Sequence, residues 1–352
     1  MRNSIKAATV LAVAAVAGLA LVGASVAHAQ SAEKFYKGKQ IRFIIPSGAG
    51  GGYDAYSRFL ARHLGDHIPG KPHLVVENMP GASGLRGTNY LYNVAPKDGT
   101  VLGSTYNNLL VEPLLGNKAA EWDSRKFEWV GSITTQYNSC MVWATSPIKT
   151  IEDAMKQEVK VSTTGLSGNS AKTPLELNKL IGTKFKVIAG YSTTGMRLAV
   201  ERGEVDGICG LSYDTYEAAN PDWILNHRIR FILQTGSVPN KAIPNVPLLT
   251  QYVKDPKDLA ALKVLGVGED AGRPHMFPPG VPKYLVEAMR RAFDATMKDP
   301  KFLAEAKKLH IQPDPMTGEQ MEKEIIEAYK APKEVVARAA ELWPVATKKE
   351  KQ

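Results

Sequence analysis

A glycine-dense turn between a short apolar run and an amphipathic stretch is the part of this sequence best suited to binding chemistry. The apolar run Ile41–Ile45 ends at Pro46, and Gly48–Gly52 follows before Asp54 and a series of apolar side chains at helical spacing. This order predicts a strand, a tight loop and the start of a helix. Glycines let backbone N–H groups approach a ligand, and a helix N-terminus carries a partial positive charge. The turn is therefore a candidate cradle for an anion or a small polar molecule.

Three more polar loops follow predicted strands. Thr164–Ser170 is dense in hydroxyls, amides and glycine before a predicted helix, Tyr191–Gly195 offers similar donors, and Tyr106–Asn108 comes directly after a strand. Such groups hold polar ligands through neutral hydrogen bonds, without a fixed countercharge. In open α/β sheets, ligands collect at the carboxyl ends of strands. We therefore expect the loops to contribute to one cleft between two α/β domains.

Each of these features also has a purely structural interpretation. The glycines of Gly48–Gly52 would also serve in a tight strand-to-helix turn, and Gly165–Ser170 in an ordinary surface loop, but the binding interpretation is favoured for both. Asp54 is suited to cap a helix or to pair with Arg58 four residues later, and the sequence favours this over direct ligand contact.

The sequence contains no motif that supports catalysis, nucleotide binding or metal binding. The glycine turn lacks the G-x-G-x-x-G order, and no GK[ST] motif occurs. His63 and His67 stand four residues apart, but no H-E-x-x-H pattern is present, so surface histidines explain the spacing. Neither Ser83 nor Ser167 lies in G-x-S-x-G. We expect no catalytic residue, no metal and no cofactor.

The elements that position these loops alternate along the chain. Strand patterns recur at 41–45, 73–77, 100–104, 140–144, 159–163, 186–188, around Cys209, and at 231–234. Helical patterns occur at 85–94, 151–157, 174–181, through Ala199 and Val200, and at 286–297, 302–309 and 319–342. This βαβα alternation predicts a mostly parallel sheet covered by helices, and 352 residues suffice for two domains.

The first 29 residues are typical of a signal peptide. Arg2 and Lys6 precede the uncharged stretch Ala7–Val26, and Ala27-His28-Ala29 has the form of a cleavage site. An uncleaved anchor is the alternative, since the stretch is nearly long enough to span a bilayer. The net charge of +9 would suit an anionic partner, but export disfavours nucleic acid, and scattered lysines indicate a solvated basic surface.

Cys140 and Cys209 are the two cysteines of the chain, and both lie in apolar, strand-like contexts. An oxidising compartment would permit a disulfide between them. Two buried free thiols are an equally ordinary outcome, because the sequence does not place the two Cα atoms within bonding range.

From about residue 35 to 342, the chain resembles the solute receptors of tripartite tricarboxylate transporters, the Bug-type (TctC-like) periplasmic receptors. The segments that carry this resemblance, in chain order, are 41–46 with 50–54, 75–84, 95–100, 203–207 and 278–282. Met79 and the polar Tyr106–Asn108 depart from the usual family pattern, as do Ser47 and Gly48. Because of these departures, the resemblance does not identify the part of the ligand that lies away from the gripped carboxylate.

The resemblance implies a type II periplasmic-binding-protein fold, in which two α/β domains joined by two crossing strands close on a ligand like a Venus flytrap. Carried onto this chain, the crossings fall at 101–105 and 231–235. The first domain would comprise 33–104 plus 232–352, and the second 105–231.

The resemblance also implies a ligand site and a function. The two facing loops would grip one ligand carboxylate, largely through backbone groups and ordered waters. The expected site residues are Ser47, Gly48, Ala49, Gly52 and Asp54 on one side, Thr164, Gly165, Gly168, Asn169 and Ser170 on the other, and Tyr191, Thr194 and Ser212 as further lining. The implied function is a monomeric periplasmic receptor that delivers a small organic acid to the large and small membrane subunits of a transporter. A sensor that docks on a membrane kinase and, less favoured, an exported enzyme are the alternatives.

Overall fold

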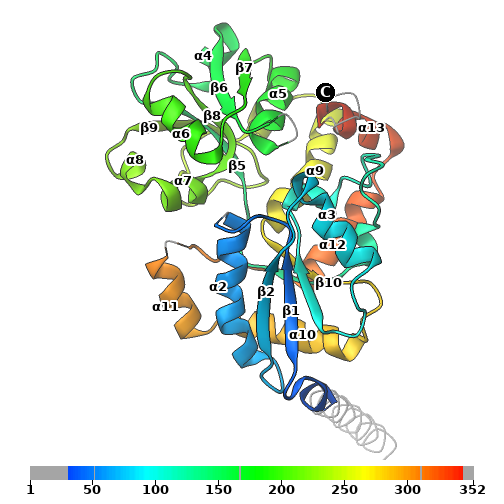
Figure 1. The fold of residues 1–352 in the computed structure, drawn as a ribbon. Coiled ribbons are helices and arrows are strands. Elements are labelled where there is room, and N and C mark those ends of the chain that lie inside the picture. Colours follow the sequence, from blue (N-terminus) through cyan, green and yellow to red (C-terminus); the bar gives the residue numbers. More distant parts are fainter. Residues whose placement is uncertain (1–30, 51, 166–167, 310, 344–352) are drawn as a thin grey trace, which may run out of the picture.

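The described part of the chain folds around two mixed β-sheets. The computed structural model describes residues 31–343 apart from 51, 166–167 and 310, so the predicted signal peptide lies outside the described residues. The sheets have the strand orders β11-β4-β10-β3-β1-β2 and β7-β6-β8-β5-β9. We call these sheets, each with the helices packed on it, the first and second units; Figure 1 shows the second above the first. The expected α/β class with two sheet-based units is confirmed.

The strands are short and the helices vary in length. The first sheet contains β1 (Gln40–Ile45), β2 (His73–Asn78), β3 (Val101–Ser104), β4 (Glu128–Ser132), β10 (Pro274–Phe277) and β11 (Met316–Thr317). The second contains β5 (Asn138–Trp143), β6 (Val159–Thr163), β7 (Phe185–Ala189), β8 (Gly207–Ser212) and β9 (Ile229–Gln234).

The helices of the first unit are α2 (Gly52–His67), α3 (Leu85–Asn93), α9 (Pro256–Ala271), α10 (Lys283–Thr296), α11 (Pro300–Lys308), α12 (Gly318–Tyr329) and α13 (Lys333–Leu342). Those of the second are α4 (Ile151–Lys156), α5 (Asn169–Ile181), α6 (Thr193–Glu201), α7 (Tyr213–Ala219) and α8 (Pro221–Leu225). Short 3₁₀ turns are η1 (Ala82–Gly84), η2 (Asn107–Leu110), η3 (Ser124–Lys126) and η4 (Leu249–Gln251). Within the described ranges no helix has the length and apolar character that crossing a bilayer requires.

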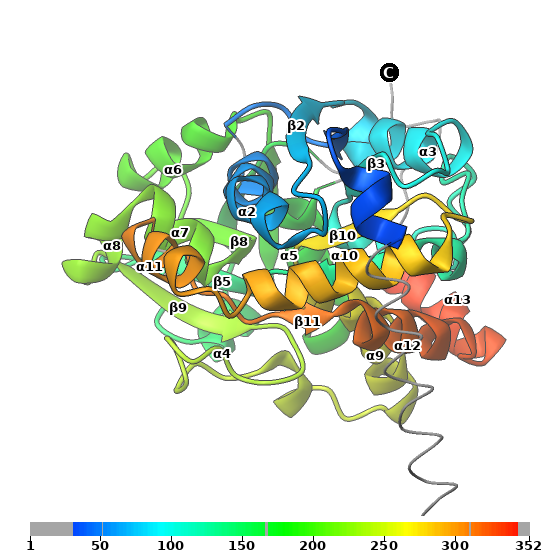
Figure 2. The same cartoon turned by 90° about the horizontal axis from the view of Figure 1, so that it is seen from below.

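Helices cover both faces of the first sheet. Phe43 and Ile44 are adjacent on β1, so their side chains point to opposite faces. Phe43 packs in a core with residues of α2 and α10, whereas Ile44 packs with residues of α3, α9 and α12. Figure 2 shows α10 lying across the sheet beside α2. β1 is thus covered on both faces and lies between β3 and β2, and this packing holds the following glycine turn in place.

Residues 105–132 lie in the first unit, which differs from the expected boundary at 104–105. Strand β4 pairs with β10 in the first sheet, for example His275 with Gly131. Upstream, Leu109 and Trp122 pack in the same core as Ile44. Their burial keeps this segment on the first sheet, and the chain first passes to the second sheet between β4 and β5.

The second boundary between the units also differs from the expected one, which was between residues 231 and 232. Residues 232–234, expected in the first domain, belong to β9, where Leu233 pairs with Cys140 of β5. The chain continues along the second unit through Leu249 and Val253, which pack in its core. It returns with α9, whose Val264 packs in the first unit.

The sheets are mixed, so the expectation of mostly parallel pairing was wrong. β1 pairs in parallel with β2 and β3, and β6 with β7 and β8. The strands β4, β5, β9 and β10 flank the passages between sheets and form antiparallel pairs. The sequence also suggested one helical stretch at 319–342. It is two helices, α12 and α13, because Pro332 lacks an N–H and stands between them as the N-cap of α13.

The two cysteines form a disulfide between neighbouring strands. Cys140 of β5 pairs in register with Cys209 of β8, and their sulfurs are bonded with the Cα atoms 4.0 Å apart. The bond therefore lies in the core of the second unit. Of the two alternatives that the sequence left open, a disulfide or two free thiols, the structure has the disulfide.

Candidate functional site

The β1–α2 loop is held by Asp54. The Oδ2 atom of Asp54 accepts a hydrogen bond from Gly50 N at 2.9 Å, and Oδ1 accepts from Arg58 Nε at 2.9 Å and Asn78 Nδ2 at 2.8 Å. Burial raises the pKa of the Asp54 carboxyl, but the hydrogen bonds and Arg58 outweigh it and hold this pKa below its usual value. Asp54 therefore fixes the loop, which agrees with the structural interpretation of this residue.

The rest of this loop presents backbone to its surroundings. Gly48, Ala49 and Gly52 are exposed, while Ser47 is buried. The carbonyl of Ser47 accepts a hydrogen bond from Asn78 Nδ2 at 2.9 Å, so the same amide holds both ends of the turn. With Asp54 engaged locally, the exposed polar groups at the start of α2 are mainly those of the backbone.

The β6–α5 loop is organised by hydroxyls that bond to one another. The hydroxyls of Thr163 and Ser170 are 2.7 Å apart and buried, and Thr163 also contacts the backbone of Gly165. Gly168 is the N-cap of α5 without a side-chain cap, and Thr164 is exposed. Ser170 therefore supports the loop from within, and Gly165 and Gly168 are half-buried.

The other three predicted lining residues, Tyr191, Thr194 and Ser212, lie on segments outside the two loops described above. The Tyr191 hydroxyl donates to Glu204 at 3.5 Å, and the Ser212 hydroxyl lies 2.9 Å from that of Thr215. Thr194 is exposed in the first turn of α6. The hydroxyls of Tyr191 and Ser212 thus make their contacts within the second unit.

A cluster at Arg273 joins the two units and was missed by sequence reasoning. Arg273 lies just before β10, and its guanidinium carbon is 4.6 Å from the ring centroid of Tyr53 and 4.3 Å from that of Tyr56, both on α2. Asp214 of α7 approaches from the second unit, with Oδ2 at 3.6 Å from Arg273 Nη2 and 3.2 Å from the Tyr56 hydroxyl. A single arginine outside any motif gives no sequence signal that it will be buried here.

Tyr53 connects this cluster to the neighbouring polar segment. Its hydroxyl donates to Gly272 O at 3.0 Å and accepts from Asn107 N at 3.0 Å. Burial raises the pKa of Tyr53 to about 12, so the phenol is neutral at physiological pH. The Tyr106–Asn108 segment is in this way fixed to the start of α2.

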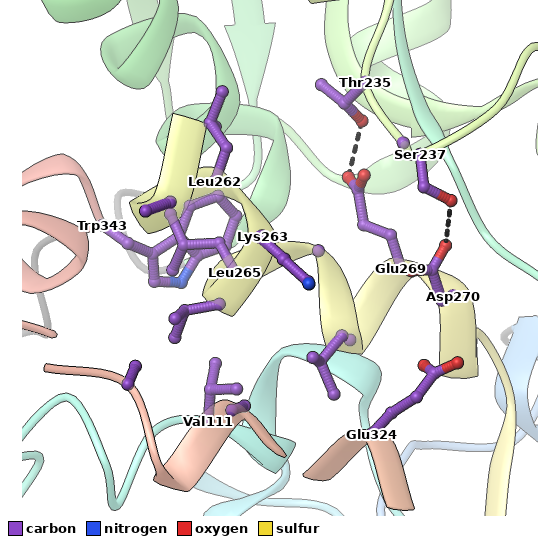
Figure 3. Close-up of a pocket in the computed structure, with 18 of the residues that line it drawn as sticks. Val111, Thr235, Ser237, Leu262, Lys263, Leu265, Glu269, Asp270, Glu324 and Trp343 are labelled. Atoms are coloured by element: carbon purple, nitrogen blue, oxygen red, sulfur yellow. Dashed lines mark hydrogen bonds between the residues drawn. The ribbon is translucent and has the colours of Figure 1, made fainter. Parts of the chain in front are cut away.

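A pocket with a cavity volume of about 780 Å³ lies where the units meet. Figure 3 shows α9 running through it, with Leu262 and Trp343 toward one end and Glu269 toward the other. Asn107, Asn138 and Asn169 also line it. Of the thirteen predicted site residues, only Asn169 is part of this lining.

Two carboxyl groups of the pocket have strongly raised pKa values. Burial, with a contribution from Glu269, raises the pKa of Glu176 to about 8. Burial also raises the pKa of Glu269 to about 7, against the hydrogen bonds that it accepts from Thr235 Oγ1 at 2.6 Å and Asn138 Nδ2 at 2.5 Å. Because Asn138 begins β5 and Thr235 follows β9, Glu269 ties α9 to both passages between the sheets.

No protein-family model matches the chain, and no curated protein matches it in sequence. Solved structures do match. A TctC solute-binding protein from Polaromonas covers 84% of this chain and 96% of its own, at 19% identity and a TM-score of 0.64. The periplasmic binding protein BugD covers 88% and 97%, at 21% identity and 0.62. A protein from R. palustris with adipate covers 86% and 98%, at 17% identity and 0.63. The chain thus has the fold of TctC- and Bug-type periplasmic binding proteins.

Proposed function

We propose that this chain is an extracytoplasmic receptor that captures a small carboxylate-bearing metabolite between its two units. The observation that carries the proposal is that α2 and α5, which belong to different units, each begin at a glycine-containing loop, exposed at Gly48, Ala49 and Gly52 and half-buried at Gly165 and Gly168. Such helix starts offer unpaired N–H groups and a favourable potential to an anion. The likeness in fold to a TctC protein and to a protein with adipate supports a carboxylate as the ligand.

The receptor would deliver its ligand to a tripartite tricarboxylate-type transporter with a large and a small membrane subunit. The mature protein would start near Gln30 and act in the periplasm as a monomer. Closure would be a hinge motion at the two passages between the sheets, which we place at residues 133–137 and between β9 and α9. A ligand that touches both units stabilises the closed arrangement by its differential affinity for it. The loop residues Ser47–Ala49, Gly52, Thr164, Gly165, Gly168 and Asn169 would line the cleft.

Isothermal titration of the secreted protein against di- and tricarboxylates and aromatic acids tests this function. We expect at least one acid to bind and to raise the melting temperature, because a ligand that binds only the folded state stabilises it. If no acid in the panel binds or raises the melting temperature, the carboxylate function is wrong. Turnover of a bound acid would instead indicate an enzyme.

A further inference from the structure

Arg273 is a buried cation, and one of its donor atoms is unpartnered among the described residues. Its side chain is only 5% exposed. Its Nε atom is buried and has no hydrogen-bond partner within the described part of the chain. A guanidinium carries five N–H donors, and burying such a group without partners is unfavourable. The fold therefore holds at this point a charge that an added acceptor would stabilise.

The carboxylate nearest to Arg273 does not fully meet this need. Asp214 Oδ2 lies 3.6 Å from Nη2, which makes an ion pair but exceeds a good hydrogen-bond distance. The same oxygen accepts the hydrogen bond of the Tyr56 hydroxyl. The faces of Tyr53 and Tyr56 attract the cation but accept no strong hydrogen bond from it.

The guanidinium also points at the N-terminus of α2. A Cβ atom placed on Gly52, the first residue of this 16-residue helix, would lie 3.2 Å from Nη2 and 3.3 Å from Nη1 of Arg273. Two sources of positive potential, the helix start and the cation, therefore converge on one place. Asp54, the acidic residue in the first turn, is engaged by Gly50, Arg58 and Asn78. An anion at this point would be stabilised by both sources.

We propose that Arg273 is the countercharge for one carboxylate of the ligand, and that Asp214 occupies part of its position in the ligand-free protein. This inference rests on the proposed function and deepens it, because it makes the site selective for acids over their neutral amides. It also differs from the grip by backbone and water that the sequence led us to expect. The absence of a side chain at Gly52 then leaves room for the ligand beside the guanidinium.

The test compares Arg273→Met, Arg273→Lys and Asp214→Asn with the unaltered protein. Arg290→Met is the matched control, because Arg290 is also mostly buried and ion-paired but contacts Glu319, Glu322 and Trp129 within the first unit. The first probe is adipate. If another acid of the panel binds more tightly, that acid is used as well. The neutral amide of each acid is the comparison. Binding is measured by titration calorimetry, and folding by circular dichroism and melting temperature.

We expect Arg273→Met to weaken acid binding roughly 10- to 100-fold, with little change for the amide, since a hydrogen bond to a charged group supplies that much affinity. Arg273→Lys should recover part of the loss, Arg290→Met should bind like the parent, and Asp214→Asn should bind the acid several-fold more tightly. Equal acid-to-amide ratios in the parent and in a folded Arg273→Met would overturn the inference. If that variant does not fold, unchanged acid binding in both Arg273→Lys and Asp214→Asn overturns it. A parent that binds no acid overturns the proposed function, and this inference with it.

Discussion

Lys172 Nζ lies 3.1 Å from Glu112 Oε1, and the two side chains are only 4% and 3% exposed. Lys172 is on α5 of the second unit, whereas Glu112 follows η2 in the first, next to core residues Val111 and Leu115. Glu112 Oε2 also accepts a hydrogen bond from Asn117 at 2.9 Å. Together with Arg273 and Asp214, this pair gives the two units charged contacts that hold them together.

Removing one partner of the buried pair should destabilise the protein strongly. In Lys172→Met or Glu112→Gln, the remaining group loses its buried partner, so the free energy of unfolding should fall by about 3–5 kcal/mol. The double variant Lys172→Met/Glu112→Met should lose less than the two singles together, because it leaves no unpaired buried charge. Urea unfolding of the three variants measures these losses.

The exposed pair Lys186–Glu158 is the control for this experiment. Its nitrogen and oxygen are 3.6 Å apart and both side chains are more than half exposed. Lys186→Met should therefore change stability by less than about 1 kcal/mol. Equal small effects at Lys172 and Lys186 would contradict the importance of the buried pair.

Substitutions of loop glycines should separate ligand binding from folding. At Gly168 a Cβ would find no atom closer than 3.9 Å, and at Gly52 it would lie 3.2 Å from Nη2 and 3.3 Å from Nη1 of Arg273, so that this guanidinium must shift slightly. We expect Gly168→Val and Gly52→Val to fold, and to lose at least about tenfold in acid affinity because the side chain obstructs the cleft. Titration calorimetry with the acid panel measures the affinities.

The matched control is Gly266→Val, since Gly266 lies in α9, lines the 780 Å³ pocket and has open space at its Cβ. This variant should bind the acid like the parent. Normal binding by both loop variants, combined with a loss in Gly266→Val, would move the site from the loops to the pocket.

The elements around the loops were predictable because their patterns are local. An apolar run followed by glycines and an amphipathic helix fixes β1, the turn and α2 without information from the rest of the chain. The strands β4 and β10 were missed because both are short and their pairing is between residues far apart in sequence. Arg273 was missed for the same reason: its partners, Tyr53, Tyr56 and Asp214, come from other elements.

Glu176 predicts a pH dependence of stability with a definite sign. Burial and Glu269 raise its pKa from 4.5 to about 8 in the folded protein, so the folded state binds more protons between these values. This contribution to stability is complete below about pH 4.5 and is lost as the pH rises through about 8. Glu176→Gln cannot ionise, so its stability relative to the parent should rise between pH 5 and 8 by up to about 1.4 kcal/mol per pH unit.

Urea unfolding at several pH values measures this difference. Glu121→Gln is the control because the Glu121 residue is exposed, so this variant removes a carboxyl group without changing a buried site. Glu269 is a less suitable choice, since Glu269→Gln would also disturb the hydrogen bonds from Thr235 and Asn138. A constant difference for Glu176→Gln would show that this carboxyl is not protonated in the folded protein.

The Cys140–Cys209 disulfide should contribute substantially to the stability of the second unit. It joins residues 69 positions apart, and closing a loop of that length in the unfolded chain stabilises the folded state by about 4 kcal/mol. We expect dithiothreitol, or the double variant Cys140→Ala/Cys209→Ala, to lower the free energy of urea unfolding by an amount of that order. Dithiothreitol should have no effect on the double variant, which controls for action of the reductant elsewhere. Thiol titration in denaturant should find no free thiol before reduction and both afterwards; free thiols in the purified protein would contradict the bond.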